Sequence, residues 1–285
     1  MILVFGKSGQ VARELQKLEG IVSIDRDQAD LANPEICIKL INDLMPSAVI
    51  NAAAYTSVDL AEKEEKLATQ INGITPGLMA KACKKQGIPF IFISSDYVFD
   101  GSGLEPWKID DLPKPINAYG RSKLNGEKAV IISGAIYAII RTSWIISSHG
   151  SNFLKTMLKL SSSTNKINVV SDQYGGPTPA SNIANACLSM AKVLISKPEK
   201  SGIYHLSGYP NVSWYEFANT IFREIGSSKI VNSILTFDYP KPAKRPLNSR
   251  LDCSKILDTL NITRPDWREE IRDLLAEMKL NVEMS

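Results

Sequence analysis

Tyr119 and Lys123 are the two residues whose types and spacing point most directly to chemistry. They stand four residues apart at the start of a helical pattern, so both side chains lie on one helix face. A phenol has a pKa near ~10, but a neighbouring ammonium stabilises the phenolate and lowers that pKa. Ser95, at the end of an apolar run, adds a hydroxyl that can hydrogen-bond the carbonyl oxygen that the phenol protonates. The trio suits the interconversion of a carbonyl and an alcohol, which requires a hydride source.

The spacing alone would also suit a surface contact between helix neighbours, so the N-terminal residues decide between the two interpretations. An apolar run over residues 2–5 is typical of a buried parallel strand and leads directly to Gly6 and Gly9. Glycines permit a tight turn and a close approach of the backbone to a pyrophosphate, and the small Ala12 lets a helix over residues 10–18 pack on the strand. A bare turn is the alternative, but a glycine loop between a strand and a helix favours a dinucleotide site.

The second expected strand, residues 21–25, bears on the choice of dinucleotide. It ends in Asp25, at about the ~20-residue offset where a carboxylate usually holds a ribose hydroxyl, which favours NAD. Arg26 and Lys7 could instead receive a 2′-phosphate, which favours NADP. The sequence leaves NADH and NADPH both open.

The order of the expected elements gives the fold class. Strands and helices alternate through the first half of the chain, which predicts an α/β fold with a doubly wound, Rossmann-like parallel sheet in residues 1–145. Residues 146–285 show no second complete core, so we expect mainly a smaller substrate-binding lobe, from which some segments return to the first domain. Ser213 and Glu216 predict a capping box at one helix start. The remaining expected strands are 48–50, 89–93, 135–140, 167–171 and 202–206, and the remaining helices are 34–44, 57–72, 75–86, 152–160, 180–195, 213–225 and 267–279.

Composition narrows the class of protein. The formal net charge of +3 over 285 residues is mild and spread along the chain, which gives nucleic-acid binding little support. No apolar run approaches the ~18 residues of a membrane span, so we expect a cytoplasmic protein. The four cysteines are far apart and only two histidines are present, so we expect buried free thiols and neither a zinc site nor disulfides. We interpret the charged run at residues 62–66 as a solvated face without function.

Four stretches taken in order resemble the extended short-chain dehydrogenase/reductases: the glycine loop, residues 51–54 (NAAA), residues 94–101 (SSDYVFDG) and the Tyr119–Lys123 pair. Within that superfamily the chain is similar, over nearly its whole length, to the reductases that form dTDP-L-rhamnose. The most specific stretches are 5–11, 95–99, 141–144, 172–178 and 245–251. The resemblance implies NADPH- or NADH-dependent reduction of the C4 keto group of a nucleotide sugar, dTDP-4-dehydro-L-rhamnose.

The resemblance also implies a role for individual residues. Tyr119 would protonate the sugar C4 oxygen, Lys123 would lower the Tyr119 pKa and hold the nicotinamide ribose, and Ser95 would support both. Thr is frequent in the family where Ser95 stands, and the hydroxyl is kept. The expected cofactor positions are Gly6, Gly9, Gln10, Val11, Asp25, Arg26, Asp30, Leu31, Ala54, Tyr55, Thr56, Tyr119 and Lys123. The expected substrate positions are Ser95, Asp96, Tyr97 and Trp144, although Trp144 could equally be a core residue.

Other functions of the same superfamily remain as alternatives. Related dehydratases carry Asp-Glu after the strand-end hydroxyl, whereas Asp96-Tyr97 follows Ser95 here, which favours simple reduction. A non-catalytic regulatory subunit, similar to the β subunit of methionine adenosyltransferase, is one alternative. A reductase or epimerase acting on another nucleotide sugar is the other, because the sequence does not set the C4 stereochemistry.

The family resemblance also bears on metal and assembly. Some bacterial members form dimers bridged by magnesium through carboxylates, and Glu14 matches one such position. The later acidic positions fall near Ala180 and Ser181, which carry no charge. We therefore expect no bound metal, and a monomer or a homodimer without a metal bridge.

Overall fold

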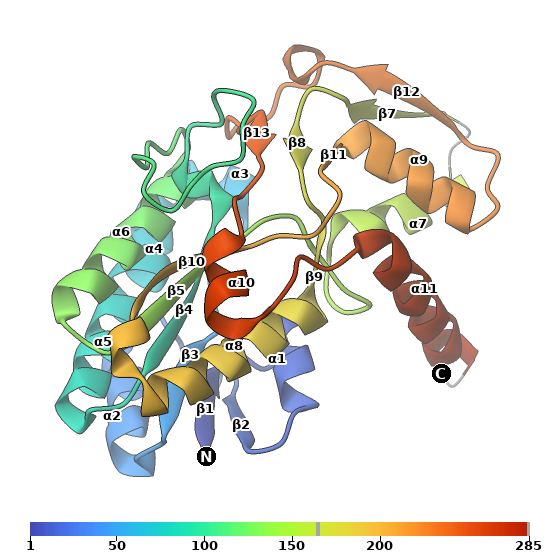
Figure 1. Cartoon of the computed structure of the whole chain (residues 1–285). Helices are drawn as coiled ribbons and strands as arrows, with labels where there is room; N and C mark the ends of the chain where they lie inside the picture. Colours follow the sequence, from blue (N-terminus) through green and yellow to red (C-terminus); the bar gives the residue numbers. More distant parts are fainter. Residues whose placement is uncertain (164–165, 284–285) are drawn as a thin grey trace.

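This computed structural model describes residues 1–163 and 166–283, and a six-stranded, wholly parallel sheet lies at the centre of its larger part (Figure 1). The strand order is β10-β5-β4-β3-β1-β2, so the order reverses direction between β1 and β3. This confirms the predicted doubly wound α/β sheet. The strands are β1 (Ile2–Phe5), β2 (Ile21–Ile24), β3 (Ala48–Asn51), β4 (Phe90–Ser95), β5 (Tyr137–Thr142) and β10 (Gly202–Leu206).

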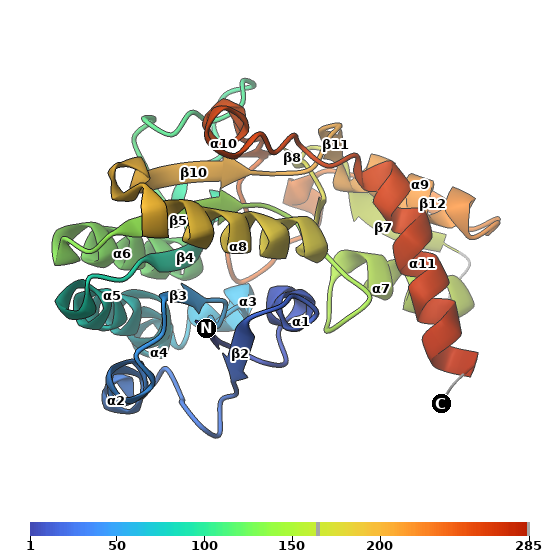
Figure 2. The same cartoon turned by 60° about the horizontal axis from the view of Figure 1, so that its bottom comes forward.

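Alternate residues of each strand enter different cores, one on each face of the sheet. Ile2 and Val4 of β1 pack into the first core, and Leu3 and Phe5 pack into the second. The helices of the first face are α1 (Gln10–Gln16), α8 (Ala180–Ser196) and α10 (Ser254–Leu260). Those of the second face are α2 (Pro34–Leu44), α5 (Thr75–Gln86) and α6 (Ala118–Ser133). Figures 1 and 2 show these two helix layers with the sheet between them.

The prediction of one continuous helix over residues 57–72 is wrong. It is divided into α3 (Val58–Ala61) and α4 (Glu65–Thr69), and a π-helical turn (Gln70–Ile74) joins α4 to α5. Pro76 explains the widened turn, because proline has no N–H with which to continue the α-helical ladder to the Asn72 carbonyl.

The second lobe has its own apolar core. Trp267 and Phe217 are fully buried there and their rings meet edge to face at 5.1 Å. The lobe contains α7 (Phe153–Ser163), α9 (Trp214–Glu224), α11 (Trp267–Glu283) and the parallel pair β7 (Lys166–Val170) and β12 (Ile230–Ile234). Ser213 and Glu216 form the predicted capping box at the start of α9.

Short strands connect the two parts of the molecule. They are β6 (Ile145–Ile146), β8 (Tyr174–Gly175), β9 (Thr178–Pro179), β11 (Val212–Ser213) and β13 (Asn248–Ser249). After the second lobe begins, the chain returns, because α8 packs on the sheet and β10 pairs in parallel with β5. All four cysteines are buried and free, as predicted. Within the described ranges, no helix is both long and apolar enough to cross a membrane.

Candidate active site

A cavity of about 450 Å³ lies at the carboxyl ends of β1 to β4, where the strand order reverses. Parallel α/β sheets bind ligands at this point, and the volume lies in the usual range for small-molecule sites. We call it the switch-point cavity. It is lined by Gly6, Lys7, Ser8, Gly9, Gln10, Val11, Asp25, Arg26, Ala29, Asp30, Leu31, Asn51, Ala52, Ala53, Ala54, Thr56, Ile71, Ile93, Ser94, Tyr119, Lys123, Ile145, Gly150 and Ser151.

Gly6 shows why the sequence needs a glycine in the first loop. Its φ is +102°, in the region that L residues rarely adopt, and a Cβ there would lie 3.1 Å from the backbone nitrogen of Ala53. The loop after β1 therefore lies directly against the loop after β3. Gly9 then caps α1 with no side-chain hydrogen bond, and α1 begins at Gln10 on the cavity wall.

Two ion pairs mark one end of the switch-point cavity. Lys7 Nζ lies 3.6 Å from Asp25 Oδ2, and Arg26 Nε lies 3.0 Å from Asp30 Oδ2. A backbone hydrogen bond from Ala32 and the Arg26 charge hold the pKa of Asp30 below its usual value. This end thus offers both a carboxylate for a hydroxyl group and cations for an anion.

The start of α6 is fixed by two acceptors. The Asn117 side chain accepts a hydrogen bond from the Gly120 N–H at 2.7 Å, and Glu62 Oε1 accepts one from the Ala118 N–H at 2.7 Å. Glu62, Lys63 and Lys66 are exposed, as expected of a solvated face, but Glu62 also helps to orient the helix that carries Tyr119.

Lys123 is buried in the wall of the cavity, with only 2% of its surface exposed. Its ammonium donates a hydrogen bond to the Ile93 carbonyl oxygen at 2.7 Å. Burial lowers the pKa of Lys123 to about 7, against the opposing charge of Glu127.

Tyr119 lines the same cavity, but its pKa moves in the direction opposite to the one expected. Burial raises the pKa of the phenol, the Asp96 charge adds to the rise, and a hydrogen bond with Ser95 opposes it. The expected lowering by Lys123 is wrong in this arrangement, because the ammonium is directed to the Ile93 carbonyl. The phenol keeps its proton at neutral pH, which is the state that a proton donor needs.

Ser95, Asp96 and Tyr97 lie beside Tyr119, at the end of β4, but outside the residues that line the cavity. The Ser95 hydroxyl donates to Asp96 Oδ1 at 2.9 Å and accepts from the Tyr97 N–H at 3.1 Å. The Tyr97 ring meets the Tyr119 ring edge-on at 5.7 Å. Burial raises the pKa of Asp96 to about 6.

Two expected site residues point elsewhere. The Tyr55 hydroxyl donates to Glu64 Oε2 at 2.8 Å, toward the helices and away from the switch-point cavity. Trp144 has a positive φ of 47° and stacks on Trp214 with ring centroids 3.5 Å apart, so one face of its indole is covered.

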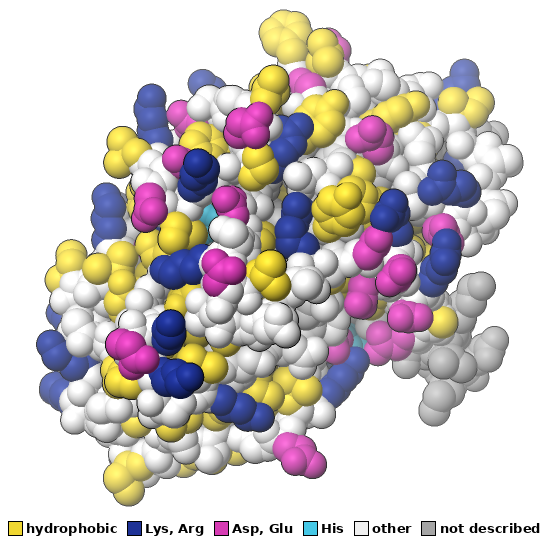
Figure 3. Space-filling view, in the orientation of Figure 1, with side chains coloured by type: hydrophobic (Ala, Val, Ile, Leu, Met, Phe, Trp, Pro, Cys, Tyr) yellow, Lys and Arg dark blue, Asp and Glu magenta, His cyan; other side chains and the backbone are white. Residues whose placement is uncertain are grey.

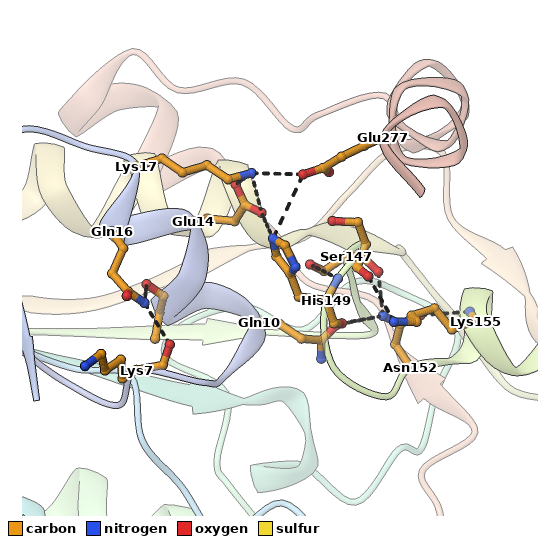
Figure 4. A network of polar contacts seen from close by, with 12 residues as sticks. Lys7, Gln10, Glu14, Gln16, Lys17, Ser147, His149, Asn152, Lys155 and Glu277 are labelled. Atoms are coloured by element: carbon orange, nitrogen blue, oxygen red, sulfur yellow. Dashed lines mark hydrogen bonds and ion pairs between the residues drawn. The ribbon is translucent and has the colours of Figure 1, made fainter. Parts of the chain in front are cut away.

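The sequence reasoning missed a contribution from the second half of the chain. Gly150 and Ser151 line the switch-point cavity, and the Asn152 side chain donates to Gln10 Oε1 at 2.9 Å. His149 lies 3.5 Å from Glu14 Oε1, between α1 and α11 (Figure 4). The signal available was the polar stretch SSHGSN at residues 147–152, between a strand and a helix.

Acidic side chains gather where α11 meets the rest of the molecule (Figure 3). Glu14, Glu270, Asp273 and Glu277 line a separate cavity of about 300 Å³, together with Ala180 and Ser181. Lys17 Nζ lies 2.9 Å from Glu14 Oε2 and neutralises part of this charge. The described part of the chain contains no group of three or more side chains suited to holding a metal ion.

Comparison with known proteins gives consistent matches over nearly the full length. The family described as "RmlD substrate binding domain" matches residues 1–280. The dTDP-4-dehydrorhamnose reductase of Escherichia coli is 38% identical over 97% of each chain. A solved dTDP-4-dehydrorhamnose reductase from Clostridium acetobutylicum superposes with a TM-score of 0.90 and 37% identity, covering 98% of this chain and 99% of that one. One from Bacillus anthracis, solved in complex with NADP, has a TM-score of 0.89 and 34% identity over 97% and 98% of the two chains.

Proposed function

Because this chain belongs to the RmlD substrate-binding-domain family, we propose that it reduces dTDP-4-dehydro-L-rhamnose at C4 to give dTDP-L-rhamnose. The single observation that carries the proposal is that Tyr119 and Lys123 line the same cavity as the glycine loop after β1. A proton donor and a dinucleotide cradle are thus available to one reacting carbonyl group.

The residues of the switch-point cavity suit a nicotinamide dinucleotide. Gly6 leaves room for close approach, and the buried Asn51 Nδ2 finds no hydrogen-bond partner among the described residues. Lys7 and Arg26 would hold a 2′-phosphate, and the Asp25 carboxylate would accept a hydrogen bond from a 2′-hydroxyl. The NADP complex of the Bacillus anthracis relative supports NADPH as one cofactor. When bound, the reduced nicotinamide supplies a hydride to the C4 carbon.

Residues of the protein itself supply the proton for the reduction. Tyr119, whose raised pKa keeps it protonated, donates its proton to the C4 oxygen as negative charge develops there. Ser95, held by Asp96 and by the Tyr97 N–H, hydrogen-bonds the Tyr119 phenol and orients it. The buried Lys123 ammonium, which donates to the Ile93 carbonyl oxygen in the same cavity, would hold the nicotinamide ribose.

We infer that the second lobe binds the sugar nucleotide. Trp144 follows β5 at the end of the parallel sheet and stacks on Trp214 of this lobe, so its indole lies where the sheet and the lobe meet, a place that suits contact with a deoxysugar. We also propose the cytoplasm as the compartment, because a nucleotide sugar and a reduced nicotinamide are both available there.

The test is the loss of NADPH or NADH absorbance on addition of dTDP-4-dehydro-L-rhamnose, with each cofactor assayed separately. Rapid oxidation, with dTDP-L-rhamnose identified as the product by NMR, is expected. Cofactor binding without oxidation of this sugar would contradict the proposal and favour another 4-keto nucleotide sugar. The absence of turnover with any such sugar, together with co-purification of a synthetase, would favour the regulatory-subunit alternative.

A further inference from the structure

Behind Tyr119 and Lys123, a buried ion pair joins Glu127 of α6 to Arg141 of β5. Each residue is only 1% exposed. The Arg141 Nε and Nη2 donate to the Glu127 oxygens Oε1 and Oε2 at 2.9 and 2.7 Å. Such two-point pairs are well oriented, but the desolvation of two buried charges offsets much of their attraction. Stability alone therefore explains the pair poorly, and its neighbours suggest a role.

Ser94 connects this pair to the switch-point cavity. The Ser94 hydroxyl donates to Glu127 Oε1 at 2.6 Å, and Ser94 lies opposite Arg141 in the register of β4 and β5. Ser94 also lines the cavity. A hydroxyl has one proton to donate, so with that proton held by Glu127 only the lone pairs of Ser94 remain available. Ser94 thus offers a hydrogen-bond acceptor.

Glu127 also acts on Lys123, which lies one helical turn earlier on the same face of α6. Burial lowers the pKa of Lys123, and the charge of Glu127 is the influence that raises it again. A neutral residue at position 127 would let burial lower this pKa further.

The other ionisable groups around the pair have different partners. Arg141 Nη1 lies 3.4 Å from His205 Nε2, and the His205 Nδ1 lies 3.1 Å from the Trp107 carbonyl oxygen. Burial and the Arg141 charge lower the pKa of His205 to about 3, so the ring is neutral and its Nε2 accepts. Asp96 and Tyr97, beyond the end of β4, act on the Tyr119 phenol.

We propose that Glu127 is a positioning residue for the reduction, which turns the Ser94 proton away from the cavity and places a carboxylate one helical turn from Lys123. The group that Ser94 then fits is a hydrogen-bond donor, either a hydroxyl or an amide N–H, on the nicotinamide half of the cofactor. Arg141 is the partner that the buried Glu127 carboxylate requires. The inference rests on the proposed function and gives roles at the same site to Glu127, Ser94 and Arg141.

The first test replaces Glu127→Met and Arg141→Met together, since apolar residues of similar volume often replace a buried ion pair without loss of stability. If the Lys123 pKa falls by one unit, kcat should fall about tenfold at pH 8 and only about twofold at pH 6. The matched control is Glu65→Gln with Arg121→Gln, which removes a two-point pair of 2.7 and 2.9 Å that α6 makes outside the cavity. That control should keep the wild-type pH profile.

Ser94→Ala tests the second half of the proposal. It leaves the ion pair in place but removes the acceptor, so it should raise the cofactor Kd about fivefold, as expected for one lost hydrogen bond. The Kd is measured from NADPH fluorescence without sugar. An unchanged Kd would overturn the assignment of Ser94 as an acceptor.

A readout without turnover uses the pH dependence of unfolding. Unfolded Lys123 holds its proton up to about pH 10, whereas the folded residue loses it near pH 7, so stability rises with pH between these values. In the double variant Glu127→Met, Arg141→Met, the rise of stability with pH should begin about one pH unit lower. The folding equilibrium constant should then change by up to about tenfold. In a Lys123→Met background the same pair should have no such effect.

The outcomes separate this proposal from the proposed function. If the methionine pair shifts neither the kcat profile nor the unfolding profile, the positioning role is overturned. If the wild-type protein reduces no 4-keto sugar, the proposed function fails, and the unfolding comparison alone decides whether Glu127 controls Lys123.

Discussion

At the scale of single residues, the protonated phenol of Tyr119 leads to the first prediction. Tyr119→Phe should lower kcat by about 10²- to 10⁴-fold, because it removes the proton donor. The cofactor Kd should stay within about twofold, since the ring and its edge contact with Tyr97 at 5.7 Å can remain. Stopped-flow absorbance and NADPH fluorescence measure the two quantities. Tyr137→Phe, at the start of β5, is the control, and wild-type turnover in Tyr119→Phe would remove the assignment.

The ion pairs at the end of β2 give a prediction about cofactor choice. Asp25→Asn removes a negative charge that would repel a 2′-phosphate and frees Lys7, which now lies 3.6 Å from that carboxylate. We expect kcat/KM to rise about fivefold with NADPH and to fall about fivefold with NADH, as for the loss of one hydrogen bond. Arg26→Gln should lower kcat/KM with NADPH alone. Equal changes with both cofactors in Asp25→Asn would contradict this role.

Single residues differ in how far the sequence could predict them. The sequence was enough to predict Tyr119, Lys123 and Gly6, because local features indicate them: the helical spacing of the first two, and the tight turn after a strand at Gly6. Ser94 was not, because its partner Glu127 comes from a helix far along the chain. The predicted direction of the Tyr119 pKa shift was wrong because burial depends on the whole fold and because the Lys123 ammonium is directed to the Ile93 carbonyl.

At the scale of elements, the close packing of α6 gives a prediction about stability. A Cβ on Gly126 would lie 2.1 Å from the Asn72 carbonyl oxygen and 2.8 Å from the Phe92 ring. Gly126→Ala should therefore destabilise the protein by about 3 kcal/mol, although alanine favours helices. Urea unfolding measures the change. The exposed Lys128→Ala on the same helix should stay within about 0.5 kcal/mol, and equal midpoints for the two variants would contradict the prediction.

Elements with clear terminal signals were predicted closely. The expected helices 34–44 and 75–86 match α2 and α5, which have a proline in the first turn, and α5 ends at Gly87 with φ of 68°. The break in residues 57–74 was missed because the π-helical turn depends on packing against α6 as well as on Pro76. A prediction from local helix propensity does not include packing against a distant helix.

At the scale of the whole molecule, the return of β10 and α8 to the sheet predicts the behaviour of a fragment. Residues 1–145 would leave the β5 edge unpaired and the core residues Val4, Ile50 and Ile140 without their α8 cover. This fragment should bind a hydrophobic dye and lack a cooperative unfolding transition, whereas the full chain should unfold cooperatively. A cooperative transition in the isolated fragment would contradict the expectation.

The overall arrangement was predictable only in part. Alternating strands and helices were enough to predict a doubly wound sheet. The apolar run at residues 202–206 was recognised as a strand, but its sequence does not say which sheet it joins. Strand order is decided by packing between distant segments, so the pairing of β10 with β5 required the structure.

The late position of β10 also has a consequence for the protein while it is being made. The last residue that lines the switch-point cavity is Ser151, whereas the sheet is complete only after Leu206 has left the ribosome. During that interval, the growing chain has every cavity residue but an open strand edge, which is prone to pairing with other chains. A dinucleotide taken up at this stage would stabilise the unfinished domain by mass action. The cellular supply of cofactor would then influence the yield of folded protein as well as its rate of turnover.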